Sequence, residues 1–222
     1  MDPDVYLWLA EGRGWRITHV LDTRVHADHL SRSRGLAGLV GATLHMPEEA
    51  PVSYPFYGLE DGDALVVGSA TLEAIRIPGH TPESTSYLLD GRALFTGDTL
   101  FLSAVGRPDL DATPEGSREK ARDLYRSLKR LLALGPETLV LPAHTSEPVA
   151  FDGDPICAPL SEVRKNIQVL QESEDVFVET IAGRVAPTPS NFERIVELNR
   201  AGEAPEGDPT ELEAGANRCA AG

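Results

Sequence analysis

The sequence predicts an α+β fold built as one main domain, and three observations support this. Residues 63–96 alternate short apolar, β-branched runs with turn residues, a pattern typical of antiparallel strands. Residues 114–134 carry apolar side chains at helical spacing. The chain has 222 residues and 41% hydrophobic content, which is enough for one sizeable core. We therefore expect one domain over residues 1–200.

The first fifth of the chain predicts a helix, a strand, a loop, a helix and a strand. Residues 4–12 predict a short helix that ends at a glycine, and residues 17–21 a strand. Residues 23–29 form a polar loop. Residues 30–40 have apolar positions at helical spacing, and residues 42–46 predict the next strand.

The middle of the chain predicts a meander of short strands and then a series of helices. The strands are expected at residues 64–67, 71–77, 84–89 and 93–96, with turn residues between them. The helix at 114–134 precedes a buried strand at 138–141, and further helices are expected at 159–172, 175–181 and 190–199.

Residues 201–222 differ in composition from the rest of the chain. They are rich in Gly, Ala, Glu and Pro and contain almost no large apolar residues. Such a segment buries too little apolar surface to offset the entropy lost on ordering. We expect a disordered acidic tail here.

Charge and cysteine content limit the classes of partner and compartment. Thirty-five acidic residues against 20 basic ones give a formal net charge of -15, which disfavours nucleic acids and anionic membranes as partners. The first residues are acidic, and no apolar run approaches the ~18 residues of a membrane span. Cys157 and Cys219 form no C-x-x-C pattern, so neither a disulfide framework nor a thiolate zinc site is indicated. We expect a soluble cytoplasmic protein.

Six residues with metal-binding side chains lie in loops that follow predicted strands. Two imidazoles and a carboxylate fall within four residues of the 23–29 loop, and the others follow the strands that end near residues 77, 96 and 141. If those strands align in sheets, the side chains converge on one edge. Imidazole and carboxylate donors suit Zn²⁺, Fe²⁺ or Mn²⁺. The candidate ligands are His26, Asp28, His29, His80, Asp98 and His144.

These segments, taken in order, resemble the metallo-β-lactamase superfamily. Residues 24–29 are similar to its H-x-H-x-D-H loop, and the P-G-H-T, T-G-D-T and P-A-H segments follow in the expected order. The resemblance covers roughly residues 15–145. It implies an αββα sandwich with metal ions held between the loops.

Within that superfamily, the loop and residues 94–101 and 105–110 look most like the persulfide dioxygenases. The resemblance implies a cytosolic enzyme that uses one non-haem Fe²⁺ and O₂ to oxidise a glutathione-type persulfide to sulfite. His80 and Asp98 would be two of its three iron ligands. Arg107 would hold an acidic partner such as Asp109 or orient its loop.

The third iron ligand of those enzymes is the first histidine of the loop, and Arg24 stands there in this chain. A guanidinium stays protonated and offers no lone pair, so it cannot coordinate a metal. Three explanations remain open: catalysis is converted or lost, His26 takes over the ligation, or the sequence contains an error at this codon.

Two other functional readings also remain open. A hydrolase of the glyoxalase II type would use one or two Zn²⁺ to cleave a thioester, with Asp28 as ligand or proton acceptor. The ligand set that such an enzyme needs for one of its metals, Asp28, His29, Asp98 and His144, is complete. The third reading is a catalytically impaired metal-binding or interaction module that keeps the scaffold without turnover.

The resemblance also implies a difference at the front of the chain. Relatives begin with a pair of strands before the helix at residues 4–12, and this chain lacks them. Their loss would leave a sheet edge and apolar surface uncovered. A start site placed too late or a homodimer would each account for this.

Overall fold

The computed structural model describes residues 3–145, 149–150, 152–184, 188–205, 207–214 and 219–221. The chain divides into two compact units. Unit 1 comprises Met1–Leu59 and Pro189–Asn217, and unit 2 comprises Glu60–Thr188 and Arg218–Gly222. The single domain expected over residues 1–200 stays a prediction.

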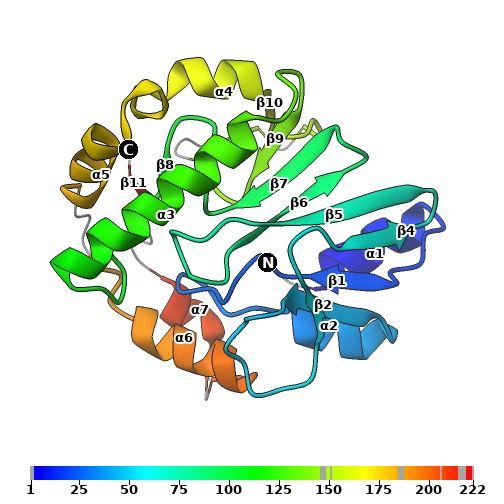
Figure 1. Cartoon of the computed structure of the whole chain (residues 1–222). Helices are drawn as coiled ribbons and strands as arrows, with labels where there is room; N and C mark the ends of the chain where they lie inside the picture. The colour runs from blue at the N-terminus through cyan, green and yellow to red at the C-terminus, as the bar shows by residue number, and fades with distance from the viewer. Residues whose placement is uncertain are drawn as a thin grey trace. The chain divides into compact units, whose positions relative to one another are not determined.

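Unit 1 is built on a three-stranded parallel sheet of order β1-β2-β3. Parallel neighbours need a crossover between them, and α2 supplies it for β1 and β2 (Figure 1). The left-handed residue Gly41 (φ 67°) ends α2. The elements of unit 1 are α1 (Asp4–Gly12), β1 (His19–Leu21), α2 (Ser33–Val40), β2 (Thr43–Pro47), β3 (Tyr57–Leu59), α6 (Phe192–Ala201) and α7 (Pro209–Glu213).

Unit 2 is built on a six-stranded mixed sheet of order β10-β9-β7-β6-β5-β4. The first four strands of the meander pair antiparallel in sequence order, and β9 then lies parallel to β7. The strands of this sheet are β4 (Ala64–Val67), β5 (Ala70–Arg76), β6 (Thr85–Leu89), β7 (Ala93–Gly97), β9 (Leu139–Pro142) and β10 (Ala158–Pro159). A separate two-stranded sheet consists of β8 (Val105–Gly106) and β11 (Ala220–Ala221).

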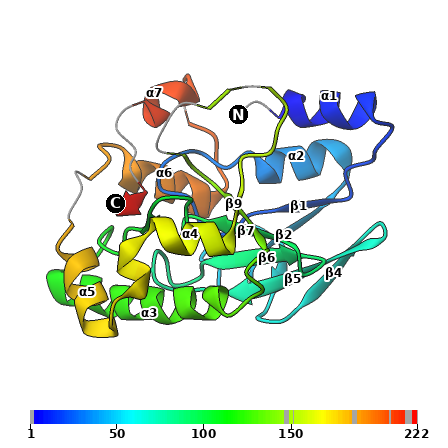
Figure 2. The same cartoon turned by 90° about the horizontal axis from the view of Figure 1, so that it is seen from above.

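Helices α3 (Pro114–Leu132) and α5 (Glu174–Ala182) pack side by side in unit 2 (Figure 1 and Figure 2). Thr113 caps the start of α3 by accepting a hydrogen bond from the Gly116 amide. The apolar face of α3 includes the buried residues Leu124, Leu128 and Leu131, which join the main core of the unit. This is the face that the helical spacing predicts.

The predicted helix at residues 159–172 is two helices in the structure. Helix α4 (Leu160–Asn166) and the 3₁₀ helix η1 (Gln168–Gln171) are separated by Ile167, whose backbone is extended (φ -107°, ψ 92°). The break buries Ile167 in the core together with Leu170. Tertiary packing therefore overrides the helical period at this point.

The described part of the C-terminal segment contains α7 and β11, which differs from the disordered tail expected there. Asp208 caps α7, and the Glu213 carboxylate accepts a hydrogen bond from the Leu30 amide at 2.9 Å. Strand β11 pairs antiparallel with β8 and buries Cys219 beside it. A few polar contacts and the pairing of a two-residue strand hold these residues in place. Neither feature can be recognised from amino-acid composition.

Helix α1 leaves large apolar side chains exposed. Trp8 is 72% exposed and Tyr6 46%, and α1 buries none of its residues. In the part of the chain that the structure describes, β1 is the first strand. The homodimer that would cover such surface stays a prediction. No helix in the described part of the chain is long and apolar enough to cross a membrane.

Candidate metal centre

The loop that follows β1 folds around the buried carboxylate of Asp22. Ser31 Oγ and Ser33 Oγ each donate a hydrogen bond to it at 2.7 Å, and His26 Nε2 lies 3.4 Å from it. Burial raises the pKa of Asp22, but the hydrogen bonds from His26, Ser33 and Ser31 outweigh this, and the pKa lies below its ordinary value. Asp22 therefore acts as a charged anchor for the loop.

Arg24 lies inside this loop among the candidate ligands. Its side chain is 1% exposed, and it donates hydrogen bonds to His26 Nδ1 at 2.7 Å and to Asp28 Oδ1 at 3.1 Å. Burial, followed by the charge of Arg24, lowers the pKa of His26 and favours its neutral form. Arg24 thus uses the acceptor nitrogen of His26 and balances the charge of Asp28.

The structure brings three of the predicted ligands together in unit 1. The ligand atoms of His26, Asp28 and His29 all lie within 4.8 Å of one another. His29 Nδ1 lies 2.9 Å from Asp28 Oδ2, and the two imidazole rings are 4.1 Å apart between centroids. His29 is the more exposed of the two histidines.

Asn199, on helix α6, contacts this loop from a part of the chain far away in sequence. Its side-chain amide donates to the carbonyl oxygens of His26 and His29, both at 2.9 Å, and its oxygen accepts from the Ser31 amide at 2.8 Å. Asn199 is buried. Sequence reasoning missed it, because an asparagine inside a helical pattern carries no signal for a contact so distant in the chain.

The other three predicted ligands meet in unit 2. His80, Asp98 and His144 follow β5, β7 and β9, and β7 lies parallel to β9, so their following loops leave the sheet at the same edge. The Asp98 carboxylate contacts both imidazoles, with Oδ2 3.8 Å from His80 Nε2 and Oδ1 3.4 Å from His144 Nε2. The side chain of Asp98 is fully buried.

The backbone of Arg107 orients His80. His80 Nδ1 donates to the Arg107 carbonyl oxygen at 2.9 Å, which leaves Nε2 to face Asp98. A backbone carbonyl commonly fixes the ring of a metal-binding histidine in this way. The guanidinium of Arg107 is buried and donates from Nε to Asp109 Oδ1 at 2.8 Å, the acidic partner that the sequence predicts.

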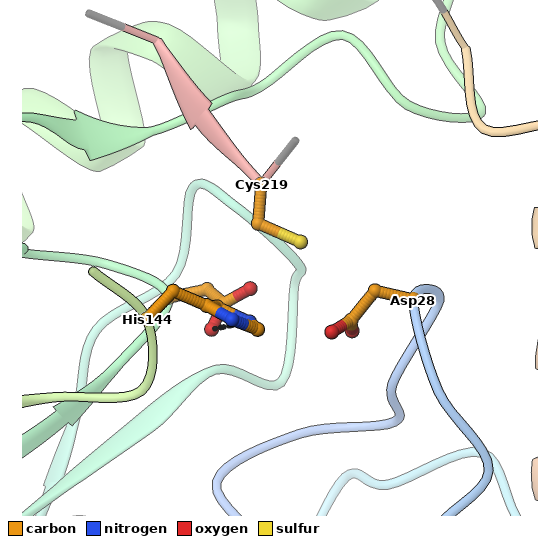
Figure 3. A group of neighbouring side chains, drawn as sticks. Asp28, His144 and Cys219 are labelled. Carbon is orange, nitrogen blue, oxygen red and sulfur yellow. Dashed lines mark ion pairs between the residues drawn. The ribbon is translucent and has the colours of Figure 1, made fainter. Parts of the chain in front are cut away.

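Cys219 adds a thiol to the group in unit 2. Its sulfur and the ligand atoms of Asp98 and His144 lie within 4.8 Å of one another (Figure 3). The sequence gives no sign of this, because Cys219 stands in the segment read as a tail and forms no C-x-x-C motif. The thiol reaches Asp98 only through the pairing of β11 with β8.

Both groups of side chains fit a divalent transition metal. Unit 1 offers imidazole and carboxylate donors, and unit 2 offers imidazole, carboxylate and thiol donors. These are the ligands that Zn²⁺ and Fe²⁺ take from proteins, whereas Mg²⁺ and Ca²⁺ prefer oxygen alone. The role of each residue as a ligand stays a prediction.

Residues 3–144 match the family described as the metallo-beta-lactamase superfamily. The chain belongs to this superfamily. The α+β metallo-β-lactamase fold predicted from the loop motifs is thereby confirmed, and the mixed sheet and helices of the structure agree with it.

Proteins that carry the names of different activities are similar to this chain. A probable metallo-hydrolase of Burkholderia pseudomallei is 31% identical over 87% of this chain and 75% of its own length. A hydroxyacylglutathione hydrolase of Methylococcus capsulatus is 37% identical over 60% of this chain, which spans only 50% of that enzyme. The crystal structure of ETHE1 from Myxococcus xanthus has a TM-score of 0.77 and 32% identity, covering 90% of this chain and 84% of its own.

Proposed function

We propose that this metallo-β-lactamase superfamily member is a cytoplasmic, iron-dependent dioxygenase that oxidises a glutathione-type persulfide to sulfite with O₂. The similarity to ETHE1, a persulfide dioxygenase, supports this because it extends over most of both chains. The observation that carries the proposal is the buried pair of His80 and Asp98, with His80 oriented by the Arg107 carbonyl. These two residues correspond by motif to iron ligands of that group.

The proposed metal ligands are the six residues predicted from the sequence. From unit 2 they are His80, Asp98 and His144, and from unit 1 they are His26, Asp28 and His29. His26 is the weakest member of the set, because Arg24 donates to its Nδ1 and its Nε2 faces Asp22. Ligation by His26 would therefore require Arg24 to withdraw.

A bound iron ion would supply the redox chemistry with O₂ that protein side chains lack. The residues of the chain position the reactants and manage protons. Asp28, whose Oδ1 accepts a hydrogen bond from Arg24, is proposed as a ligand or as a proton acceptor. The Arg107 backbone keeps His80 in one orientation, and the Arg107 side chain, paired with Asp109, keeps that backbone in place. Arg107 is accordingly a positioning residue in this proposal.

A second candidate function is hydrolysis of a thioester with one or two Zn²⁺. It is favoured by Arg24, which replaces a ligand that iron uses in the dioxygenases, while Asp28, His29, Asp98 and His144 are all present. A zinc-bound water would have a pKa of about 7 and would attack the thioester carbonyl.

Metal analysis and two parallel assays test the proposal. The protein is purified anaerobically, its iron and zinc are measured by mass spectrometry, and it is assayed for O₂ uptake with glutathione persulfide and for hydrolysis of a hydroxyacylglutathione. Iron near one equivalent with O₂ uptake and sulfite formation is the expected result. Thioester hydrolysis with zinc and no O₂ uptake would replace the dioxygenase with the hydrolase.

The variant Arg24→His sharpens this experiment. If activity with the persulfide is low in the wild type and rises in Arg24→His, the arginine has impaired a dioxygenase. If the wild type binds neither metal and lacks both activities, both proposals fail and an interaction module remains.

A further inference from the structure

The thiol of Cys219 lies beside two proposed metal ligands of the same unit. The sulfur, a carboxylate oxygen of Asp98 and an imidazole nitrogen of His144 are within 4.8 Å of one another. Figure 3 shows Cys219 near His144, and Cys219 directly precedes strand β11. Two ligands of one tetrahedral metal ion stand roughly 3–4 Å apart, so a small adjustment brings all three atoms onto one ion.

The backbone around Cys219 fixes this position. The Arg107 amide donates to the Cys219 carbonyl oxygen at 3.0 Å, and Ala220 and Ala221 pair with Gly106 and Val105. The sulfur is therefore set by a sheet ladder whose partner strand, β8, is buried.

Gly106 brings that ladder close to Asp98. A Cβ at Gly106 would lie 2.1 Å from the Asp98 carbonyl oxygen and 3.2 Å from His80 Cβ, so only glycine permits this approach. Strand β8 thus lies against Asp98 and His80. Because β11 pairs with β8, Cys219 lies close to the same residues.

The thiol of Cys219 has apolar neighbours in addition to the proposed metal ligands. Cys219 is buried with Phe101 and Ala104, and the Phe101 ring lies 6.2 Å from the His144 ring between centroids. A buried thiol in this position has the environment of a metal ligand that is shielded from solvent.

We propose that Cys219 is a thiolate ligand of the metal, completing an Asp98, His144 and Cys219 site in unit 2. This rests on the proposed metal-dependent function and adds a ligand to it. On binding, the thiol loses its proton to solvent and the sulfur forms a bond to the divalent ion. A thiolate favours Fe²⁺, Zn²⁺ or Co²⁺ over hard cations such as Mg²⁺.

Cobalt substitution tests the inference without any activity assay, because sulfur bound to Co²⁺ produces a near-ultraviolet charge-transfer band. Apoprotein is loaded with Co²⁺ alone, and wild type is compared with Cys219→Ser and Cys157→Ser. Cys157 is the only other cysteine of the chain, so its variant is a matched control. Circular dichroism and thermal melting confirm that each variant is folded.

The expected result is a charge-transfer band in wild type and Cys157→Ser that is absent in Cys219→Ser. We expect Cys219→Ser to bind Co²⁺ about 100-fold more weakly. Removing a residue that only hydrogen-bonds to a metal ligand typically weakens binding 10–100-fold, and loss of a ligand should cost at least as much. Stoichiometric Co²⁺ without the band in wild type would overturn the thiolate ligand and leave the proposed metal site standing. If Co²⁺ binds to none of the three proteins, both the inference and the proposed function fail.

Discussion

Arg24 is a fully buried cation that donates hydrogen bonds to His26 and Asp28. The side chains of the Arg24–Asp28 ion pair are 1% and 5% exposed, so removing the guanidinium breaks a buried ion pair. We expect Arg24→Ala to lower the free energy of unfolding by about 3–5 kcal/mol in urea denaturation of the apoprotein.

The matched control for this prediction is Arg130→Ala. Arg130 pairs with Asp61, and both side chains are about half exposed, so the expected loss is at most about 1 kcal/mol. Equal losses for the two variants would show that burial of the Arg24 pair carries no special energy.

The proposed ligands were the part of the candidate site most open to prediction, because each lies next to a strand end and within a recognisable motif. His80, Asp98 and His144 follow β5, β7 and β9, and the structure brings them together as predicted. Cys219 and Asn199 could not be found in this way. Both act through contacts between segments far apart in the chain, which leave no local pattern.

Helix α6 holds the loop after β1 through the side chain of Asn199. Three hydrogen bonds connect this side chain to His26, His29 and Ser31. Outer contacts of this kind fix the orientation of metal ligands. We expect Asn199→Ala to weaken metal binding about 10–100-fold, measured by competition with a chromophoric chelator.

Asn191→Ala serves as its control, because Asn191 precedes the same helix but donates to Leu212 and contacts no predicted ligand. It should leave metal affinity within about twofold of wild type, since its loss affects stability alone. Equal weakening by both variants would mean that α6 acts through general stability.

Several elements with a clear apolar period were predicted from the sequence, whereas four very short strands were not. The meander from β4 to β7, and helices α1 and α3, begin within one residue of their predicted positions because apolar periodicity extends over enough residues to be seen. Strands β3, β8, β10 and β11 have two or three residues and show no period. Gly79 allows α3 to approach the loop after β5, since a Cβ there would lie 2.4 Å from Leu124 Cα.

The proposed metal binds only the folded protein, so removing it should lower the stability of the protein. A ligand that binds only the folded state at 100 times its dissociation constant adds about 2.7 kcal/mol to the free energy of unfolding. We expect a chelator to lower Tm by several degrees and readdition of Fe²⁺ or Zn²⁺ to restore it, measured by anaerobic thermal melting.

The double variant Asp98→Asn, His144→Ala is the control for this measurement. Because it lacks two proposed ligands, its Tm should not respond to chelator. A Tm shift of equal size in wild type and double variant would place the stabilising ion at another location.

The construction of unit 1 from two distant parts of the chain determines the order in which the protein can fold. The Ser31 amide is 168 residues from Asn199, and the Leu30 amide is 183 residues from Glu213. Closing such loops costs more chain entropy than closing the adjacent hairpins of β4 to β7, and it is slower. The loop after β1 is therefore expected to reach its native form late, after the hairpins. In a nascent chain whose residues 189–214 have not yet been synthesised, this loop lacks its hydrogen bonds to Asn199 and Glu213.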